Sequence, residues 1–357
     1  MSPAPTYDVL VVGLGPAGAS AAAAAARAGA RVLGVERRRQ VGVPVQCAEF
    51  APMLLGTETP ALRKAHWQDI AEMATFVEGA LPDRNQGFRG AMIDRAAFDQ
   101  ALCEEARAAG AELRLGVGLD ALDGAGVATL QDGDRIWAPA IVGADGPRSK
   151  VGSRVGLVNT DLLETRQFAA PLRRASASTD IFLKAEIQGG YGWLFPKGEI
   201  ANVGLGVEMA VRVRLKPLLE ALRRTLIAEG VIGEAIHSWT GGAIPVGGAL
   251  EPTARLARAA VLLAGDAAGL TNPVTGAGIP AAVVSGALAG AAAGRVAAGA
   301  ATALDDYEDE IDDRFGDSLR RAVLRRRDMK SAFRRAEPPA MADWRRGWIA
   351  FPEYWAA

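Results

Sequence analysis

The first residues whose types and spacing could do chemistry form a glycine pattern near the N-terminus. Gly13-x-Gly15-x-x-Gly18 follows an apolar run and precedes an alanine-rich segment. Gly13 permits a tight turn, Gly15 lets a pyrophosphate approach the backbone, and Gly18 lets helix and strand pack closely. The free N–H groups and positive dipole end of the following helix would bind phosphate, so Pro16 and Ala17 belong to the same expected site.

An acidic residue completes this pattern. A second apolar run, residues 31–35, ends directly before Glu36. An acid at this distance from the glycines accepts hydrogen bonds from an adenosine ribose. We therefore predict a dinucleotide site that includes Glu36 and its neighbour Arg37. The pattern alone does not separate FAD from NAD.

Two later turns favour FAD. One run of residues predicts a strand before Gly143, Asp145 and Gly146, and another predicts a strand at 260–264 before Gly265-Asp266. Each could be a plain turn by itself. An aspartate after a strand–glycine turn suits a ribityl hydroxyl, so the two turns together extend the dinucleotide site to Asp145, Gly265 and Asp266.

The helix expected after Asp266 has its own place in this site. An Asn-Pro turn containing Pro273 precedes Gly276, Ala277 and Gly278, and a small-residue helix starts near Ile279. The N-terminal amides of such a helix can face the N1/C2=O edge of a flavin, where negative charge accumulates on reduction. We assign these residues to the cofactor site.

A second candidate site is aromatic. Residues 189–207 predict a β-hairpin, with two extended runs joined by a glycine-bearing turn at 197–199. Tyr191, Trp193 and Phe195 then share one face of the first strand. Such a face is either packed core or the wall of a site for a flat or apolar molecule.

Length and composition restrict the class of protein. The chain has 357 residues, which suggests about two domains or one large α/β domain with an insertion. Half of the residues are apolar and the net charge is −1, which indicates a globular protein and no nucleic-acid binder. Cys47 and Cys103 are too few for a disulfide framework, and no basic-then-apolar leader precedes the first strand, so we expect a cytoplasmic protein. His66 and His237 are too few for a metal cluster.

Two segments bear on membrane contact. Residues 279–301 have the length of a membrane span, but alanine and glycine dominate and Arg295 lies inside, which favours close packing in a soluble fold. Residues 320–346 are rich in arginine and lysine. This basic segment would suit either an anionic membrane surface or an acidic protein partner, although a solvated helix is the simpler interpretation.

The glycine and aspartate turns, in this order, resemble the FAD-binding fold of the para-hydroxybenzoate hydroxylase type. With the aromatic hairpin, "GGAIPVGG" at 241–248 and "VPVQCAEF" at 43–50, the chain resembles the geranylgeranyl reductase family of FAD enzymes. The resemblance spans about residues 7–290. It implies FAD as resident cofactor and an aromatic strand that lies over or beside the flavin.

The resemblance also implies roles for particular side chains. Tyr191 and Trp193 would line a flavin-facing substrate cavity, and Cys47 would be a catalytic thiol or an inert buried one. We also assign Gln46, which precedes Cys47 in the sequence, to the cofactor site. Arg95, at the start of a helix that Asp94 is expected to open, lies either near the FAD or in solvent.

The expected fold is α/β, with a para-hydroxybenzoate hydroxylase-like FAD-binding Rossmann-type domain, an inserted antiparallel substrate sheet and C-terminal helices. We place the FAD domain at residues 1–75, 94–158 and 251–315, the substrate domain at 76–93 and 159–250, and a C-terminal helix and tail at 316–357.

Three functions fit these residues. The first, implied by the resemblance, is reduction of C=C bonds in an isoprenoid lipid, with NAD(P)H visiting the flavin transiently because no second dinucleotide motif occurs. The second is electron donation to a partner such as an iron–sulfur protein, which the basic C-terminal segment favours. The third is an oxygen-using hydroxylase or halogenase, although the aromatic strand lacks the paired tryptophans of the halogenases.

Overall fold

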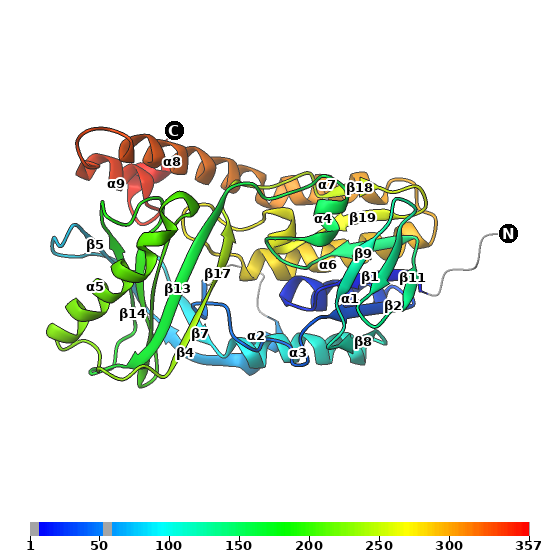
Figure 1. Ribbon diagram of the computed structural model, residues 1–357, viewed down its shortest axis with the longest axis horizontal. Helices are drawn as coiled ribbons and strands as arrows, with labels where there is room; N and C mark the ends of the chain where they lie inside the picture. Colours follow the sequence, from blue (N-terminus) through cyan, green and yellow to red (C-terminus); the bar gives the residue numbers. More distant parts are fainter. Residues whose placement is uncertain (1–6, 53–58, 357) are drawn as a thin grey trace.

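The structure is a computed structural model that describes residues 7–52 and 59–356. Two sheet-based halves lie next to each other along the long axis of the molecule, and helix α8 (Asp317–Phe333) extends over both (Figure 1). The first half carries the N-terminal strands and the second the long strands of the middle of the chain. This confirms the α/β class and the inserted sheet.

The first half is built on a six-stranded sheet in the order β18-β19-β12-β1-β2-β8, parallel except for β18 at its edge. Its strands are β1 (Val9–Val12), β2 (Val32–Glu36), β8 (Glu112–Leu115), β12 (Ala140–Gly143), β18 (Thr253–Arg255) and β19 (Ala260–Leu263). Strands β1, β12 and β19 are buried throughout, which explains their continuous apolar sequences.

Helices α1 (Pro16–Arg27) and α6 (Ile279–Ala297) pack against each other beside this sheet. A Cβ atom on Gly286 would lie 2.1 Å from the Ala17 carbonyl oxygen, and one on Gly290 would lie 2.1 Å from that of Ala21. The small residues of α6 therefore permit contact between the two backbones. Of the described helices, only α6 has the length and hydropathy of a membrane span, and half of that stretch is buried inside the molecule.

The second half is a seven-stranded, mostly antiparallel sheet in the order β17-β13-β16-β15-β14-β5-β6. Its strands are β5 (Glu72–Val77), β6 (Asp83–Asn85), β13 (Leu162–Pro171), β14 (Ser178–Leu183), β15 (Gly192–Lys197), β16 (Ile200–Glu208) and β17 (Ser238–Pro245). The predicted hairpin is β15–β16, with Gly198 at φ +63° in its turn. Helix α5 (Leu215–Ala228) packs its leucines on one face of this sheet.

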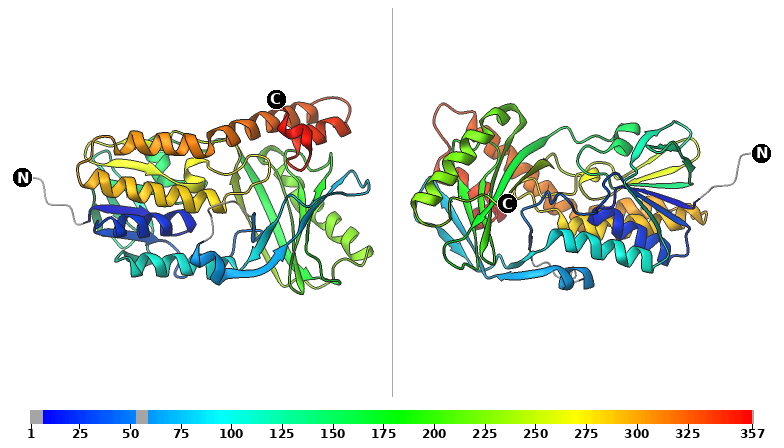
Figure 2. Two further views of the ribbon diagram at one scale, coloured as in Figure 1. Left: turned by 180° about the vertical axis from the view of Figure 1, so that it is seen from behind. Right: turned by 60° about the horizontal axis from the view of Figure 1, so that its bottom comes forward.

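Shorter elements complete the two halves (Figure 2), and the segment at 119–137 packs on the core of the first half. Two three-stranded sheets contain β9 (Leu119–Leu122), β10 (Val127–Leu130) and β11 (Arg135–Trp137), and β3 (Phe50–Pro52), β4 (His66–Ile70) and β7 (Gly90–Ile93). The remaining helices of this part are α2 (Pro60–Ala65), α3 (Arg95–Ala108) and α4 (Lys150–Arg154). Asp94 caps α3 as expected, since its side chain accepts a hydrogen bond from the N–H of Ala97 at 2.9 Å.

The C-terminal helices contact both halves of the molecule. They are α7 (Ala303–Ile311), α8, α9 (Met341–Gly347) and α10 (Pro352–Trp355). Tyr307 of α7 donates a hydrogen bond to the Leu263 carbonyl of the six-stranded sheet at 2.7 Å. Further along, Arg326 of α8 donates to the Gly189 carbonyl of the second half at 2.6 Å. The domain boundaries drawn from the sequence stay a prediction.

Candidate functional site

The turns predicted to hold the cofactor meet at one edge of the six-stranded sheet. The Ala144 N–H donates to the Val12 carbonyl at 2.8 Å, and the Ala264 N–H donates to the Gly143 carbonyl at 3.0 Å. The loops that leave β1, β12 and β19 are therefore neighbours. Loops at the carboxyl ends of parallel strands form the usual ligand site of such sheets.

The glycine turn between β1 and α1 fits a pyrophosphate. Gly13 has φ +89°, and a Cβ there would lie 2.5 Å from the Ala144 carbonyl oxygen, so no other residue fits. At Gly15 a Cβ would meet nothing within 4 Å, and no side chain caps α1, whose first residues are Pro16 and Ala17. The open space and uncapped amides suit an anion.

Glu36 holds this turn in shape. Its two carboxylate oxygens accept hydrogen bonds from the backbone N–H groups of Leu14 and Arg38, each at 3.0 Å. Arg37 is exposed, whereas Arg38 turns inward and donates to the Pro44 carbonyl at 3.2 Å and to Gln46 at 2.5 Å. The role of Arg37 in the cofactor site stays a prediction, and nothing in a run of arginines marks Arg38 as the one that contacts the loop at 43–50.

Asp266 and the start of α6 form the far side of the site. The Asp266 carboxylate accepts a hydrogen bond from the Thr271 hydroxyl at 2.7 Å. Burial raises the pKa of Asp266, against the opposing effects of Thr271 and the charge of Arg95. Gly278 precedes α6 without a side-chain cap, and a Cβ there would lie 3.3 Å from an Asp266 carboxylate oxygen. These features also suit a bound flavin.

The loop between Asp266 and α6 is shaped by its own side chains. Asn272 accepts hydrogen bonds from the N–H groups of Val274 and Thr275, each at 3.0 Å, and this places Pro273 inside a tight turn. Gly276 has φ +70°, Ala277 donates its N–H to the Thr275 hydroxyl, and Ile279 begins the helix. That the backbone groups of this loop face a flavin edge stays a prediction.

Asp145 binds its own loop. Its carboxylate accepts hydrogen bonds from the hydroxyl of Ser149 and, at 2.7 Å, from the backbone N–H of Lys150, at the start of α4. Burial raises its pKa, while these donors lower it. Asp145 therefore positions the turn after β12 at the cofactor edge, with Gly146 at φ +85° beside it.

The loop at 43–50 crosses four strands of the seven-stranded sheet. The contacts run along the loop in order, from Thr240 of β17 to Val45, from Gln46 to Gly241 of β17, from Gln167 of β13 to Cys47, from Asn202 of β16 to Ala48, and from Lys197 of β15 to Glu49. The last four measure between 2.8 and 3.2 Å. The sheet therefore sets the position of Cys47.

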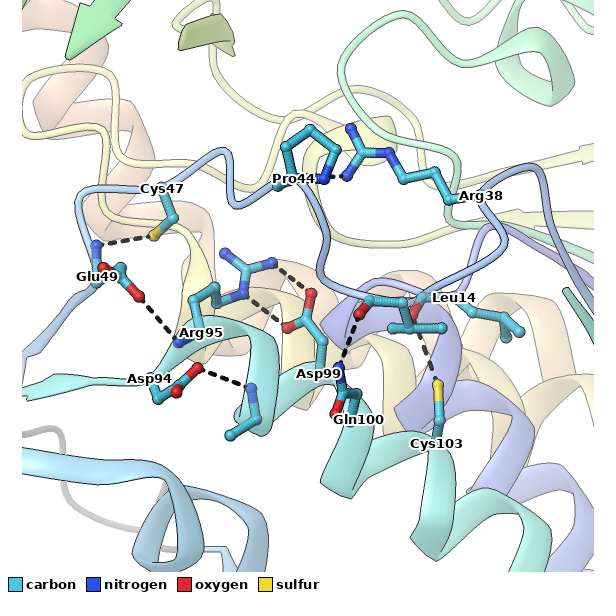
Figure 3. A network of polar contacts seen from close by, with 12 residues as sticks. Leu14, Arg38, Pro44, Cys47, Glu49, Asp94, Arg95, Asp99, Gln100 and Cys103 are labelled. Carbon is cyan, nitrogen blue, oxygen red and sulfur yellow. Dashed lines mark hydrogen bonds and ion pairs between the residues drawn. The ribbon is translucent and has the colours of Figure 1, made fainter. Parts of the chain in front are cut away.

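Arg95, the first residue of α3, lies at the centre of a polar network that reaches this loop (Figure 3). Its guanidinium donates to Asp99 at 2.7 Å, and its backbone N–H donates to Glu49 at 3.1 Å. The N–H of Glu49 in turn donates to the Cys47 sulfur at 3.2 Å. Burial opposes the charge of Arg95, but Asp99 and Cys47 together raise its pKa above the usual value. The Arg95 side chain is 18% exposed, so it is not a solvated side chain, and its position near the FAD stays a prediction.

The aromatic face is packed against the C-terminal helices. Tyr191, just before β15, contacts Trp193 and Trp348 edge-on, with ring centroids 5.8 and 4.8 Å apart. Trp193 and Phe195 are buried, and a cavity of about 40 Å³ remains between Tyr191 and helices α8 and α9. The Tyr191 hydroxyl donates to the Thr275 carbonyl at 2.5 Å. The aromatic strand therefore contacts the loop before α6.

Comparison with known proteins agrees with these features. Residues 8–150 match the family of FAD dependent oxidoreductases. The chain is 33% identical over 310 residues to the digeranylgeranylglycerophospholipid reductase of Methanosarcina acetivorans, a match that covers 78% of this chain and 73% of that protein. The chain belongs to the geranylgeranyl reductase family of FAD-dependent oxidoreductases.

Solved structures of other flavoproteins have the same fold as this family member. A geranylgeranyl bacteriochlorophyll reductase-like protein from Thermoplasma acidophilum superimposes with a TM-score of 0.79 and 26% identity, over 91% of this chain and 87% of that one. PqsL from Pseudomonas aeruginosa, a probable FAD-dependent monooxygenase, has a TM-score of 0.67 at 18% identity, over 91% of this chain and 96% of that one. The second match supports the fold alone.

Several residues of the site escaped sequence reasoning. Lys197, Gln167 and Asn202 bond to the loop at 43–50, and Glu49 is the partner of Lys197 within it, yet nothing in the sequence marks these side chains as partners. The positive φ of Glu49, +67°, is likewise invisible in the sequence. The described residues contain no group of histidine, cysteine and acidic side chains that could hold a metal ion.

Proposed function

We propose that this family member reduces carbon–carbon double bonds of an isoprenoid lipid, with NAD(P)H as the transient source of electrons. The relatives named above support the substrate class. The observation that carries the proposal is the hydrogen bond from Tyr191 to the Thr275 carbonyl. It joins the aromatic strand to the loop that faces the expected flavin edge, so an apolar substrate and the cofactor would share one site.

The residues that would hold FAD lie at the uncapped starts of helices α1 and α6 and include the carboxylates of Glu36 and Asp266. The amides around Gly15 would bind the pyrophosphate, and Glu36 the adenosine ribose. Asp266 would bind the ribityl chain, and the amides at Gly278 the flavin edge. When bound, FAD would supply hydride transfer, from the donor to the flavin and from the flavin to one carbon of the double bond, while the other carbon takes up a proton.

Other side chains would position and shield the substrate. Trp193 donates to Gln167 at 2.8 Å, and Gln167 donates to the Cys47 carbonyl at 3.1 Å. The aromatic strand and the Cys47 loop are thus held together by a buried amide. Tyr191 and Trp193 would exclude water from the reacting carbon, and Cys47 would present its thiol from the loop that Gln167 holds.

The alternative of an electron donor to a protein partner rests on the basic segment at 320–346. In the structure much of this charge is used within the molecule. Arg325 donates to the carbonyl groups of Tyr354 and Ala356, Lys330 pairs with Asp161, and Arg345 pairs with Glu353. Contact with a membrane or a partner protein through this segment, and the cytoplasmic location, stay proposals with no support from these contacts.

The test is reduction of an isoprenoid lipid by the purified FAD-loaded protein. We expect lipid-dependent reoxidation of the reduced flavin in the wild type, and its loss in Tyr191→Ala and Trp193→Ala. Transfer of electrons from NAD(P)H to a dye should persist in both variants. A flavin that is reoxidised only by oxygen or by an acceptor protein, and never by lipid, would refute the proposal.

A further inference from the structure

A second hollow lies away from the site described above. Its volume is about 730 Å³, and it opens between strands β13 and β17, the 3₁₀ segment η1 (Met209–Arg214) and the start of α5. Four cationic side chains line it, Arg148, Arg166, Arg212 and Lys216. This basic groove stands out in a protein whose net charge is −1.

Most of this positive charge is unneutralised. Arg148 lies 3.5 Å from Glu164, and both side chains are partly exposed. Within residues 7–52 and 59–356, no carboxylate lies within ion-pair distance of Arg166, Arg212 or Lys216. Like charges gathered on one surface repel one another unless an anion lies between them, so the groove is suited to a ligand with more than one negative charge.

The groove also has a flat apolar surface. The indole of Trp239 is 54% exposed and lines the groove on β17. It packs edge-on against Phe168, with ring centroids 5.5 Å apart, which fixes its orientation. An exposed, immobilised indole next to arginines is the arrangement that stacks an aromatic base beside bound phosphates.

The groove lies at the β17 edge of the sheet, and its two faces differ: Arg166 and Trp239 lie on the face opposite to the aromatic cluster, whereas Thr165 and Thr240 lie on the same face as that cluster. Arg166 faces Leu205 across the strands, and Leu205 belongs to the core under α5. The next residue, Gln167, points to the other face and bonds Trp193. A ligand bound at Arg166 is therefore separated from Tyr191 and Trp193 by the sheet, but it can extend past the β17 edge towards Gln46.

The groove also reaches the loop at 43–50, whose Gln46 and Cys47 belong to the expected cofactor site. Gln46 lines the groove, donates to the Gly241 carbonyl at 3.0 Å, and precedes Cys47 in the chain. We propose that the basic groove binds the diphosphate and adenine of the nicotinamide dinucleotide that donates electrons, with Arg166 and Arg212 as phosphate ligands. This site rests on the proposed function, since it assigns a place to the electron donor named there.

Direct binding tests the site without electron transfer. NADP⁺ and, separately, inorganic pyrophosphate are titrated calorimetrically into the oxidised FAD-loaded protein. We expect Arg166→Ala and Arg212→Ala each to weaken both ligands about tenfold, because each removes a charge-assisted contact. Arg224→Ala is the matched control, since this exposed arginine of α5 lies outside the groove, and it should leave both affinities unchanged.

Rapid mixing with NADPH separates binding from chemistry. In the two groove variants the NADPH concentration at half-maximal flavin reduction should rise about tenfold, with the limiting rate and the FAD content unchanged. Protein reduced by dithionite should still reduce the lipid at the wild-type rate in both variants. This arm distinguishes a wrong donor site from a wrong lipid reaction.

Equal NADP⁺ affinity in the wild type and both groove variants would overturn the proposal, as would an absence of NADP⁺ and pyrophosphate binding. Phosphatidylglycerol vesicles supply the competing arm. If the variants lose only vesicle binding, the groove holds a lipid headgroup and the dinucleotide site is refuted.

Discussion

The rings of Tyr191 and Trp348 meet edge-on, with centroids 4.8 Å apart and planes inclined at 62°. Tyr191 precedes the aromatic strand, and Trp348 directly follows helix α9. The end of the chain thus covers the surface on which an isoprenoid would have to lie, and it leaves a cavity of about 40 Å³. A long lipid can reach Tyr191 only if the segment around Trp348 moves away from it.

Removal of the covering indole should lower stability and enlarge the cavity. Trp348 is 3% exposed, so we expect Trp348→Ala to reduce the free energy of unfolding by about 3 to 5 kcal/mol. Trp355→Ala should cost less, because that side chain is half exposed. Urea unfolding measures both. Equal losses in the two variants would show that Trp348 does not pack as described.

Loss of the Glu36 carboxylate should weaken FAD binding. Glu36→Ala removes the acceptor for the Leu14 and Arg38 N–H groups and for the expected ribose, so we expect the dissociation constant to rise about tenfold or more. Glu251→Ala, at an exposed carboxylate, is the control. Titration of the apoprotein with FAD gives the constants. Release of NAD instead of FAD on denaturation would contradict the assignment.

The two thiols should differ in reactivity. Burial raises the pKa of the Cys103 thiol to about 12, and its sulfur lies 3.8 Å from the Leu14 carbonyl oxygen, whereas Cys47 is half-buried. A thiol reagent should therefore modify Cys47 in the folded protein and Cys103 only after unfolding. Cys47→Ser should alter the visible spectrum or reoxidation rate of the flavin. Identical flavin behaviour in Cys47→Ser and Cys103→Ser would make Cys47 structural.

The ion pair between Lys197 and Glu49 should be costly to break. The nitrogen and oxygen are 2.8 Å apart, and the side chains are 10% and 9% exposed. Lys197→Ala leaves a buried carboxylate without its cation, so we expect a loss of about 3 to 5 kcal/mol in unfolding free energy. Lys64→Ala breaks a pair with Glu104 at 2.7 Å that is largely exposed, and solvent screening should make its effect small. Similar effects in both variants would argue against the buried pair.

Asp180 should make the protein less stable as the pH rises. Burial raises its pKa from 3.8 to about 6, although Ser178 donates a hydrogen bond to it at 3.0 Å. The folded state therefore holds this proton more tightly, and the contribution is present below pH 3.8 and lost as the pH rises through 6. The side chain of Asp180→Asn cannot ionise, so the variant should not lose stability over this pH range. Above pH 6 we expect its free energy of unfolding to exceed that of the wild type by at most about 3 kcal/mol. Parallel stability curves of wild type and variant between pH 4 and 7 would contradict this.

The sequence alone determined the features that depend on neighbouring residues. The turn at Gly13, the hairpin joined by Gly198, the cap at Asp94 and the buried parallel strands each arise from backbone geometry, burial pattern or a side-chain oxygen within a few positions. The order of these motifs was also enough to indicate the family and its FAD fold, which the comparisons confirm.

Only the tertiary structure decided how distant segments meet. Glu49 bonds Lys197 across 148 positions of the chain, and the loop around it crosses four strands whose order in the sheet differs from their order in the sequence. The burial of Trp348 against Tyr191 and the gathering of Arg148, Arg166 and Arg212 around one groove arise in the same way. Local propensity holds no information about such contacts, because the packing of whole elements sets them.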